Sequence, residues 1–456
     1  MNKNILSTKF LWGLFFIALA FILCLSSRLV FDHDEFESIH VAWKIFTGQK
    51  IYVDFFEHHE AFFYYLLVGF VALFKENVDV LFAARGFIFL MILLIFFVVY
   101  HMASKLFGKE SARIGLILLA SNEIFILKAV EIRPDVPQTL FGLLAVSLLF
   151  DFFRKGSLKD LVLSSISLGV SLLFIQKSVL FAGVIGMVLL FSACLNRIKF
   201  REVFLYLVVC LATLMPYYLC LALNGQLHAY LRWCWIFASH ILHWEAPLIT
   251  LWTLMRNFQT DFMLILCFLS LFFLDTQVKK KMGAISLLFL IILIWVQAHR
   301  LQYFLPLMPL LAIMAGYAVY NLAGLSRKYR WFIVWTIMVI YVLCPFRSYL
   351  KIMTNSPNNA TLEKVRYVLS ITTSQDYVYD GNIRFNLFRK DPGFFWFTIL
   401  DKMPSGRKYY DIYQAIDMFK PKVISSYLIP DMKDERVSLH YRMSDRYKDL
   451  FIRTKG

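Results

Sequence analysis

The sequence predicts an α-helical polytopic membrane protein that carries a small α/β domain at its C-terminus. Of the 456 residues, 59% are hydrophobic, whereas soluble proteins are about 45–50% apolar. The mean hydropathy is +0.63. Apolar stretches of about 18 or more residues recur along most of the chain, and each is long enough to cross a hydrocarbon core of roughly 30 Å. These observations indicate a chain that crosses the bilayer repeatedly.

Eleven apolar stretches are assigned as membrane spans. They are residues 10–30, 80–103, 112–129, 136–153, 159–176, 178–195, 202–222, 255–274, 283–298, 303–323 and 331–347. No small-residue cleavage site follows the first stretch, so we expect it to remain as an anchor. The segment 61–74 is apolar but only about 14 residues long, which suits a helix lying at the membrane interface.

The basic residues between the spans support this assignment. With the N-terminus in the cytoplasm, all five basic clusters lie on the cytoplasmic side, as the positive-inside rule requires. Those clusters are 105–113, 154–159, 197–201, 279–281 and 327–330. Counting 61–74 as a span would move all five outside. The clusters also account for the net charge of +16. Since no basic run is interleaved with aromatics, no nucleic-acid partner is predicted.

The same topology places the loop 31–79 and the C-terminal tail outside the cell membrane. We therefore expect a transmembrane domain over 1–347, which includes the loop 31–79, and an extracytoplasmic domain over 348–456. Within the tail, 365–371 and 411–419 read as helices, and 377–379 and 423–427 read as strands. The expected location is the inner (plasma) membrane, with many spans.

The loop 31–79 concentrates acidic residues, which are costly at a bilayer surface unless they serve a function. Asp34 and Glu35 open a segment whose apolar positions predict an amphipathic helix of three turns that ends near Gly48. A carboxylate is favoured at a helix start. Asp34 could therefore be only a cap, although a cap and a catalytic role are compatible.

The tetrapeptide 57–60, Glu-His-His-Glu, lies directly before the predicted interfacial helix. Its side chains could bind a divalent metal, bind sugar hydroxyls or cap the helix. Adjacent residues of a helix face different ways, so only some of the four can share one site. His240 and His243, in an aromatic-rich outer loop, are metal candidates together with Glu57.

Further polar residues lie at the predicted outer ends of other spans, namely Arg133, Asp135, Lys177, His299 and Arg300. Each alone is typical of an interfacial anchor. Together, the arginines could hold phosphate oxygens in bidentate pairs, and the carboxylates could take protons from hydroxyls. The Gly-rich phosphate loops of nucleotide enzymes are missing from the sequence, so no direct nucleotide binding is expected.

These motifs resemble those of a known family. Asp34-Glu35 after the first span, followed by 48–59, resembles the first outer loop of GT-C fold membrane glycosyltransferases. Within them, it is most similar to bacterial enzymes related to protein O-mannosyltransferases and aminoarabinose transferases. The turn 133–135 is similar to the second acidic turn of that group, and 300–309 to its late motif of aromatic, Leu and Pro residues. The similarity covers about residues 10–350.

The resemblance implies a GT-C fold and a lipid-linked sugar donor, usually a polyprenyl-phosphate sugar, used outside the membrane. In such enzymes the Asp of the Asp-Glu pair acts on the acceptor, which corresponds to Asp34. The carboxylate before the interfacial helix, here Glu57, contacts a metal or the acceptor in some members. Two departures matter. Relatives often have Pro after the His or Lys here, where this chain has Glu60-Ala61, and aminoarabinose transferases have a basic residue two places after the Asp-Glu pair, where this chain has Glu37. Their donor and lipid A acceptor are therefore not transferred.

The predicted function is transfer of a hexose or pentose from a polyprenyl-phosphate-linked donor to a lipid, polysaccharide or protein of the cell envelope. Asp34 is predicted to be the general base, with Glu35 beside it as a second catalytic residue. The predicted substrate-binding residues are Asp54, Glu57, His58, His59, Arg133, Asp135, Lys177, His299 and Arg300. A divalent metal is the one cofactor left open, with Glu57, His240 and His243 as candidate ligands.

Two other classes stay open. A transporter or flippase of a lipid-linked or small anionic substrate is the main alternative, but transporters often carry charges near the bilayer midplane. Here the ionisable residues lie mostly at span ends and in outer loops. The third class is a non-catalytic assembly subunit, which should tolerate loss of both Asp34 and Asp135.

Overall fold

The chain folds into two compact units, each assembled from three separate stretches. The computed structural model describes residues 3–237, 252, 254–255, 257–295, 301–325, 328–345, 349–350, 354, 358–396, 411–426, 429 and 431–454. The first unit, called the helical unit, comprises Met1–Leu29, Arg85–Tyr218 and His243–Asn355. The second, called the mixed unit, comprises Val30–Ala84, Leu219–Leu242 and Ser356–Gly456.

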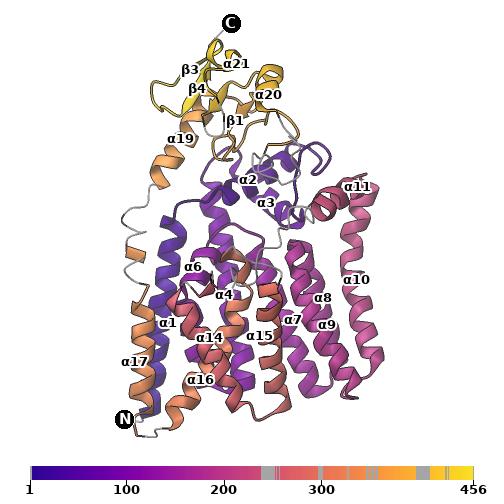
Figure 1. Cartoon of the computed structure of the whole chain (residues 1–456), viewed down its shortest axis with the longest axis vertical. Helices are drawn as coiled ribbons and strands as arrows, with labels where there is room; N and C mark the ends of the chain where they lie inside the picture. Colours follow the sequence, from indigo (N-terminus) through magenta and orange to yellow (C-terminus); the bar gives the residue numbers. More distant parts are fainter. Residues whose placement is uncertain are drawn as a thin grey trace. The chain divides into compact units, whose positions relative to one another are not determined.

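Apolar helices build the helical unit (Figure 1). They are α1 (Lys3–Arg28), α4 (Val80–Phe107), α5 (Lys109–Ala120), α6 (Glu123–Ala129), α7 (Asp135–Lys155), α8 (Leu158–Phe174), η1 (Gln176–Ser178), α9 (Val179–Cys194), α10 (Phe200–Leu223), α14 (Phe258–Ser270), η3 (Leu271–Phe273), α15 (Gln277–Trp295), η4 (Leu301–Phe304), α16 (Leu307–Leu325) and α17 (Arg330–Leu343). Six described helical stretches are long and apolar enough to cross a membrane. The polytopic helical class is therefore confirmed, while the count of eleven spans stays a prediction.

The predicted span 112–129 is wrong as a single helix, because the structure divides it into α5 and α6. The division occurs at Asn122, whose side chain accepts from the backbone N–H of Phe125 at 3.0 Å and so caps α6. Gln259 of α14 completes the break, since it donates to Ser121 O at 2.7 Å and accepts from the N–H of Glu123 at 2.9 Å. A buried amide side chain thus satisfies the backbone groups that the interrupted helix leaves open.

Small residues allow a close helix contact in the helical unit, between α5 and α16. A Cβ built on Gly316 would lie 2.5 Å from the backbone nitrogen of Gly115 and 2.6 Å from Ser111 O. Serines connect α7 with α8, since Ser164 donates to Ala145 O at 2.7 Å and Ser171 to Gln138 O at 2.9 Å. Close backbone approach and such hydrogen bonds are the usual means of helix association in lipid.

Two short helices begin the mixed unit: α2 (His33–Phe46) packs against α3 (Phe62–Phe74). As predicted, α2 ends before Gly48, whose φ of +92° is a conformation that favours glycine. With 13 residues, α3 is about 20 Å long at 1.5 Å per residue, which is shorter than a hydrocarbon core. From the middle of the chain, α11 (Leu227–Tyr230) and the π-helical turn η2 (Leu231–Phe237) join the same unit.

The C-terminal residues of the mixed unit form a small α/β fold. Its helices are α19 (Asn358–Ile371), α20 (Ile412–Phe419) and α21 (Glu435–Ser438), and its strands are β1 (Val378–Tyr379), β2 (Val423–Ser425), β3 (Tyr441–Met443) and β4 (Leu450–Arg453). The sheet order is β1-β2-β4-β3, in which β1 and β2 are parallel and the other pairs antiparallel. The first two helices and strands match the sequence prediction, whereas β3 and β4 were not predicted.

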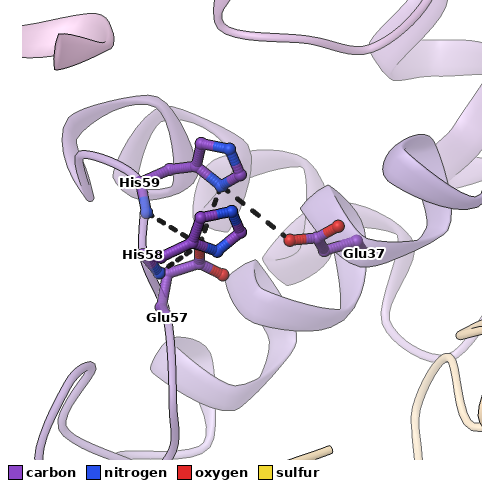
Figure 2. Close-up of side chains that lie close together, drawn as sticks. All are labelled: Glu37, Glu57, His58 and His59. Carbon is purple, nitrogen blue, oxygen red and sulfur yellow. Dashed lines mark hydrogen bonds and ion pairs between the residues drawn. The ribbon is translucent and has the colours of Figure 1, made fainter. Parts of the chain in front are cut away.

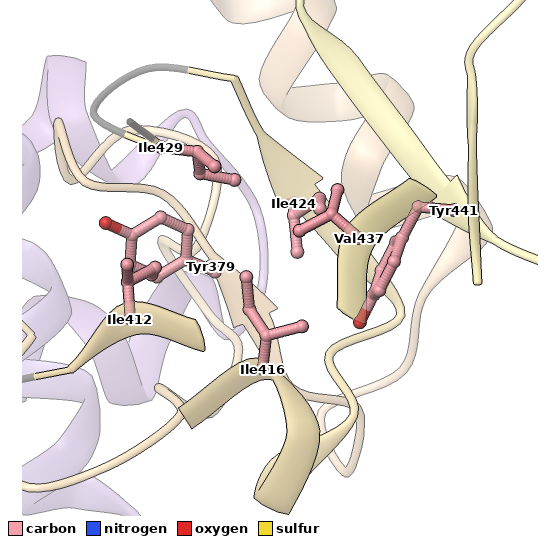
Figure 3. Close-up of a cluster of buried hydrophobic side chains, with 7 residues drawn as sticks. All are labelled: Tyr379, Ile412, Ile416, Ile424, Ile429, Val437 and Tyr441. Atoms are coloured by element: carbon pink, nitrogen blue, oxygen red, sulfur yellow. The ribbon is translucent and has the colours of Figure 1, made fainter. Parts of the chain in front are cut away.

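The core of this fold lies where α20 and α21 pack on the sheet (Figure 3). Its buried members are Tyr379, Ile412, Ile416, Ile424, Ile429, Val437 and Tyr441. Asp411 caps α20 by accepting from the N–H groups of Tyr413 and Gln414. The strands are short, so burial of these side chains rather than sheet hydrogen bonding is expected to supply most of the stabilisation.

Candidate active site

The start of α2 is a complete capping box, and Asp34 is not its cap. Asp32 is the N-cap and accepts from the N–H of Asp34 at 3.2 Å, while Glu35 accepts from the N–H of Asp32 at 2.9 Å. Glu35 is fully buried. The purely structural reading of Asp34 as the cap is therefore wrong, and the carboxylate of Glu35 has a structural contact that a catalytic role would have to share.

The carboxylate of Asp34 is half-buried and paired with a histidine. His33 lies between two acids, with Nδ1 2.8 Å from Asp32 Oδ1 and Nε2 2.9 Å from Asp34 Oδ1. Hydrogen bonds to Asp32 and then to Asp34 raise the pKa of His33 to about 10. Burial opposes ionisation of Asp32, but the hydrogen bond and charge of His33, together with the backbone N–H of Asp34, outweigh it and lower the pKa of Asp32. At neutral pH, a charged imidazolium thus orients both carboxylates.

A second cluster combines Glu37 of α2 with the tetrapeptide before α3 (Figure 2). One ligand atom from each of Glu37, Glu57, His58 and His59 lies within 4.8 Å of the others. Nδ1 of His59 is 2.9 Å from Glu57 Oε1 and 4.0 Å from Glu37 Oε1, and Nδ1 of His58 is 3.5 Å from Glu57 Oε1. Two carboxylates and two imidazoles are a donor set that suits zinc or a similar cation.

Glu57 is the fixed centre of this cluster. Its Oε1 accepts from the backbone N–H groups of His58 at 2.8 Å and His59 at 3.0 Å. Burial opposes ionisation of Glu57, but the hydrogen bonds from His59 together with the charges of His59 and His58 outweigh it and lower the pKa of Glu57. Its Oε2 is buried and has no hydrogen-bond partner among the described residues. An ionised carboxylate with one oxygen engaged and the other buried without a hydrogen bond among the described residues fits a cation ligand.

The surrounding side chains hold the tetrapeptide in place. Tyr52 donates to His59 O at 2.8 Å, and Tyr230 of α11 donates to Glu60 Oε1 at 2.6 Å. Tyr64 of α3 is buried, and burial followed by the charges of Glu57, Glu37 and Asp34 raises its pKa. The phenol of Tyr64 is therefore neutral, and its hydroxyl lies 3.5 Å from His59 Nδ1.

Asp54 does not join either cluster. It is exposed, and its carboxylate accepts from the N–H of Lys50 at 2.6 Å, which closes the turn after α2. This hydrogen bond within the turn gives no support to the predicted role of Asp54 in substrate binding, which stays a prediction.

In the helical unit, the turn before α7 carries a network of charges. Lys177 Nζ is 3.2 Å from Asp135 Oδ1, and Arg133 Nε is 3.5 Å from Asp135 Oδ2. Arg133 also lies 3.3 Å from Glu131, which pairs with Lys128 at 2.6 Å. The structure thus brings together three of the predicted residues, Arg133, Asp135 and Lys177.

This network has more positive than negative charges among its described side chains. Asp135 is 1% exposed and Arg133 8%, whereas the side chain of Lys177 is 25% exposed. Lys177 also lies over the ring of Tyr303 at 4.0 Å, within the late motif 300–309. His299, Arg300, His240 and His243 lie outside the described residues.

Sequence reasoning missed the roles of Glu37 and Tyr64 in the cluster. Glu37, His40 and Lys44 recur at helical spacing along α2, yet all three are buried. Three polar residues at helical spacing lie on one face of α2, and this pattern could have indicated that Glu37 faces the site. For Tyr64 the sequence carried none, because the residue lies within an aromatic run.

Comparisons with known proteins support the same class. Residues 58–220 match the family model for dolichyl-phosphate-mannose-protein mannosyltransferases. Among curated proteins, no sequence matches significantly. ArnT from Cupriavidus metallidurans bound to undecaprenyl phosphate has a similar structure, with a TM-score of 0.67, 14% identity and coverage of 99% of this chain and 97% of ArnT. The structure of ArnT in the apo state is similar with a TM-score of 0.68, 15% identity and coverage of 97% of each chain.

An archaeal protein extends the likeness. The oligosaccharyltransferase AglB from Archaeoglobus fulgidus, in complex with an inhibitory peptide and a dolichol-phosphate, gives a TM-score of 0.62 at 12% identity. The match covers 91% of this chain and 69% of AglB. The chain therefore has the fold of the GT-C membrane glycosyltransferases, as the sequence predicted.

Proposed function

We propose that the protein transfers a sugar from a polyprenyl-phosphate carrier to a hydroxyl group of an envelope acceptor on the outer side of the membrane. The family match over 58–220 and the similarity to ArnT bound to undecaprenyl phosphate and to AglB in complex with a dolichol-phosphate support this class of donor. The observation that carries the proposal is Asp34, a half-buried carboxylate oriented by a charged histidine and not used as the helix cap.

In the proposed reaction, the acceptor hydroxyl gives its proton to Asp34 while its oxygen attacks the anomeric carbon. The bond between that carbon and the phosphate oxygen breaks, and its electron pair leaves with the polyprenyl phosphate. Direct displacement inverts the anomeric carbon. His33 keeps the carboxylate in one orientation, with its Nε2 2.9 Å from Asp34 Oδ1.

The leaving phosphate needs positive charge. In the helical unit, Arg133 and Lys177 are the described cations that we assign to the phosphate of the carrier. Asp135 holds both side chains, which fixes their direction before the donor binds. Arg300 stays a candidate for the same role.

Glu37, Glu57, His58 and His59 are proposed to orient the acceptor or the sugar, directly or through a divalent cation. A crystal structure of the Archaeoglobus fulgidus oligosaccharyltransferase contains Zn and sulfate, which makes a cation plausible in this fold. When bound, such a cation would supply positive charge that fixes hydroxyl or phosphate oxygens. The residues themselves contribute the buried charge of Glu57 and the fixed imidazole of His59.

The test is a comparison of envelope glycans from cells with and without the gene, by mass spectrometry. We expect one glycan to lose a single hexose or pentose, and expect the wild-type gene but not Asp34→Asn to restore it. A transporter would instead pass its substrate without needing the carboxylate at this position. Full restoration by Asp34→Asn, or purified protein that moves no sugar from a polyprenyl-phosphate donor, would reject the proposal.

A further inference from the structure

A short C-terminal segment, Asn386–Trp396, contacts the acidic loop at two points within the mixed unit. We call this segment the brace. Its first contact is Asp391, which is buried between two side chains of α2. Oδ2 of Asp391 lies 2.9 Å from His40 Nε2 and also pairs with Lys44, while Oδ1 accepts from Asn386 at 2.6 Å.

The electrostatics make this contact specific. Burial opposes ionisation of Asp391, but the charges of His40 and Lys44 outweigh it and hold its pKa far below the usual range. His40 Nδ1 lies 3.0 Å from Leu387 O, so the ring connects the backbone and a side chain of the brace. Lys44 lies over the ring of Trp396 at 3.9 Å. A buried charge needs such partners, because the loss of one leaves the others uncompensated.

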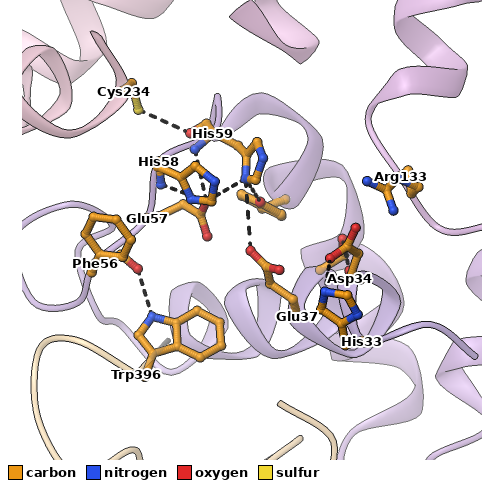
Figure 4. A network of polar contacts seen from close by, with 12 residues as sticks. His33, Asp34, Glu37, Phe56, Glu57, His58, His59, Arg133, Cys234 and Trp396 are labelled. Carbon is orange, nitrogen blue, oxygen red and sulfur yellow. Dashed lines mark hydrogen bonds and ion pairs between the residues drawn. The ribbon is translucent and has the colours of Figure 1, made fainter. Parts of the chain in front are cut away.

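The second contact fixes the residue before Glu57 (Figure 4). The backbone N–H of Phe56 donates to Phe394 O at 2.9 Å, and the indole N–H of Trp396 donates to Phe56 O at 2.8 Å. Both polar backbone groups of Phe56 are therefore bound by the brace. The ring of Phe56 is fully buried and packs on Phe395 and on Trp233, each at 5.4 Å between ring centroids.

We infer that the brace positions Glu57 for the reaction, with Asp391 and Trp396 as positioning residues that touch no reacting group. This inference rests on the proposed function. The carboxylate of Glu57 bonds to the backbone of the next two residues, so its place is set by the chain at 56–59. Because a misplacement of roughly 1 Å can reduce a rate about 100-fold, a fixed Phe56 is expected to matter for turnover.

A second effect of Asp391 concerns charge. Lys44 is buried, and both Glu57 and Glu37 act on its charge. Asp391 neutralises Lys44 directly, which leaves the two glutamates to interact with the substrate or a cation. Burial lowers the pKa of Lys44 and the charge of Asp391 opposes this shift, so loss of Asp391 would favour the uncharged amine.

The experiment uses the full chain in nanodiscs and three variants. Trp396→Phe keeps an aromatic ring and removes the N–H that bonds to Phe56 O. Asp391→Asn removes the buried charge. The matched control is Asp449→Asn. It breaks the ion pair between Asp449, whose side chain is 47% exposed, and Lys364 of the same C-terminal region. Hydrogen exchange of a peptide covering 51–60 and steady-state kinetics are measured for each.

We expect the amides at 51–60 to exchange about fivefold faster in Trp396→Phe, as for loss of one hydrogen bond. The effect should be larger in Asp391→Asn, and Asp449→Asn should match the wild type. In both brace variants, the kcat per folded protein should fall while the KM for the donor changes less than about twofold. The folded fraction is measured by size-exclusion chromatography, because a loss of folded protein alone would lower the apparent kcat without changing KM. Should Asp391→Asn fail to fold, Trp396→Phe alone decides.

Unchanged exchange at 51–60 in Trp396→Phe would overturn the inference, as would an equal change in the Asp449→Asn control. Faster exchange with an unchanged kcat would also overturn it, because the position of Glu57 would then not limit turnover. If no variant and no wild-type sample transfers sugar, the proposed function fails, while the exchange data still report whether the brace holds the loop.

Discussion

Replacing Asp34 with asparagine is the sharpest test of the candidate site, because the structure separates its catalytic from its structural role. Asparagine has the same size but cannot take up the proton of an acceptor hydroxyl. The capping box of α2 is made by Asp32 and Glu35, so it persists in the variant. The variant loses the ion pair with His33. In that pair the side chain of His33 is 41% exposed and that of Asp34 is 27% exposed.

The two effects differ in free energy, because the structural loss is small and the catalytic loss is large. A partly exposed ion pair contributes about 0–1 kcal/mol, and a carboxylate in the first helical turn adds about 0.3–1 kcal/mol. The free energy of unfolding should therefore fall by less than about 2 kcal/mol. General base catalysis is worth about 100- to 10,000-fold in rate, or about 3–5 kcal/mol of activation free energy. Transfer should fall far more than the folded fraction.

Asp32→Asn is the matched control. It removes a neighbouring carboxylate that also bonds to His33, while asparagine caps a helix as well as aspartate does. Transfer is measured with labelled polyprenyl-phosphate sugar in membranes, and folding by size-exclusion chromatography and thermal unfolding. We expect Asp32→Asn to keep most activity. Retention of more than about a tenth of the wild-type rate by Asp34→Asn, or an equal loss in Asp32→Asn, would refute the assignment.

Three further perturbations test other parts of the structure. The pKa of His33 is about 10 in the folded protein, above its usual value. The stability that the charged His33 contributes is therefore full below about pH 6.5 and is lost as pH rises toward 10. His33→Gln should make the unfolding temperature fall less steeply between pH 6.5 and 10, and an unchanged slope would contradict the raised pKa. Glu57→Gln should weaken the binding of Mn²⁺ or Zn²⁺ to the purified protein by at least about tenfold, measured by metal analysis, whereas Glu363→Gln, at an exposed position, should not. Equal metal binding by Glu57→Gln and the wild type would argue against the cluster as a cation site. Gly316→Ala should lower the free energy of unfolding by about 1–3 kcal/mol, because the added Cβ would lie 2.5 Å from backbone. Gly183→Ala, whose Cβ would have nothing within 4 Å, should not lower the unfolding temperature. Equal unfolding temperatures for the two variants would contradict the close packing at Gly316.

The sequence was sufficient for elements whose signals are local. The apolar periodicity of α2 and Gly48 predicted a helix and its end, and both lie where expected. The strands β1 and β2 are short buried runs of Val, Ile and Tyr, the residue types that strands favour. By contrast, β3 and β4 begin with one buried residue followed by exposed or half-buried ones, so composition gave little indication of a strand.

Features that depend on distant partners were not predictable. The break between α5 and α6 depends on Gln259, which lies 138 residues after Ser121, and nothing near Asn122 reports that partner. Likewise, Lys44 reads as a surface residue of an amphipathic helix until Asp391 is known to lie beside it. The candidate site was therefore located from local acids and histidines, whereas the groups that hold it came only from the structure.

The discontinuous mixed unit has a consequence for biosynthesis. His40 and its partner Asp391 are separated by 351 residues, so at a synthesis rate of about 5–20 residues per second the loop waits roughly 18–70 s for its brace. Throughout that interval the nascent chain carries the loop without the hydrogen bonds from the brace to Phe56, the residue before Glu57. A product truncated before Trp396 would insert its helices yet never complete this loop, so ribosomes that stop early would leave inert rather than partly active protein in the membrane.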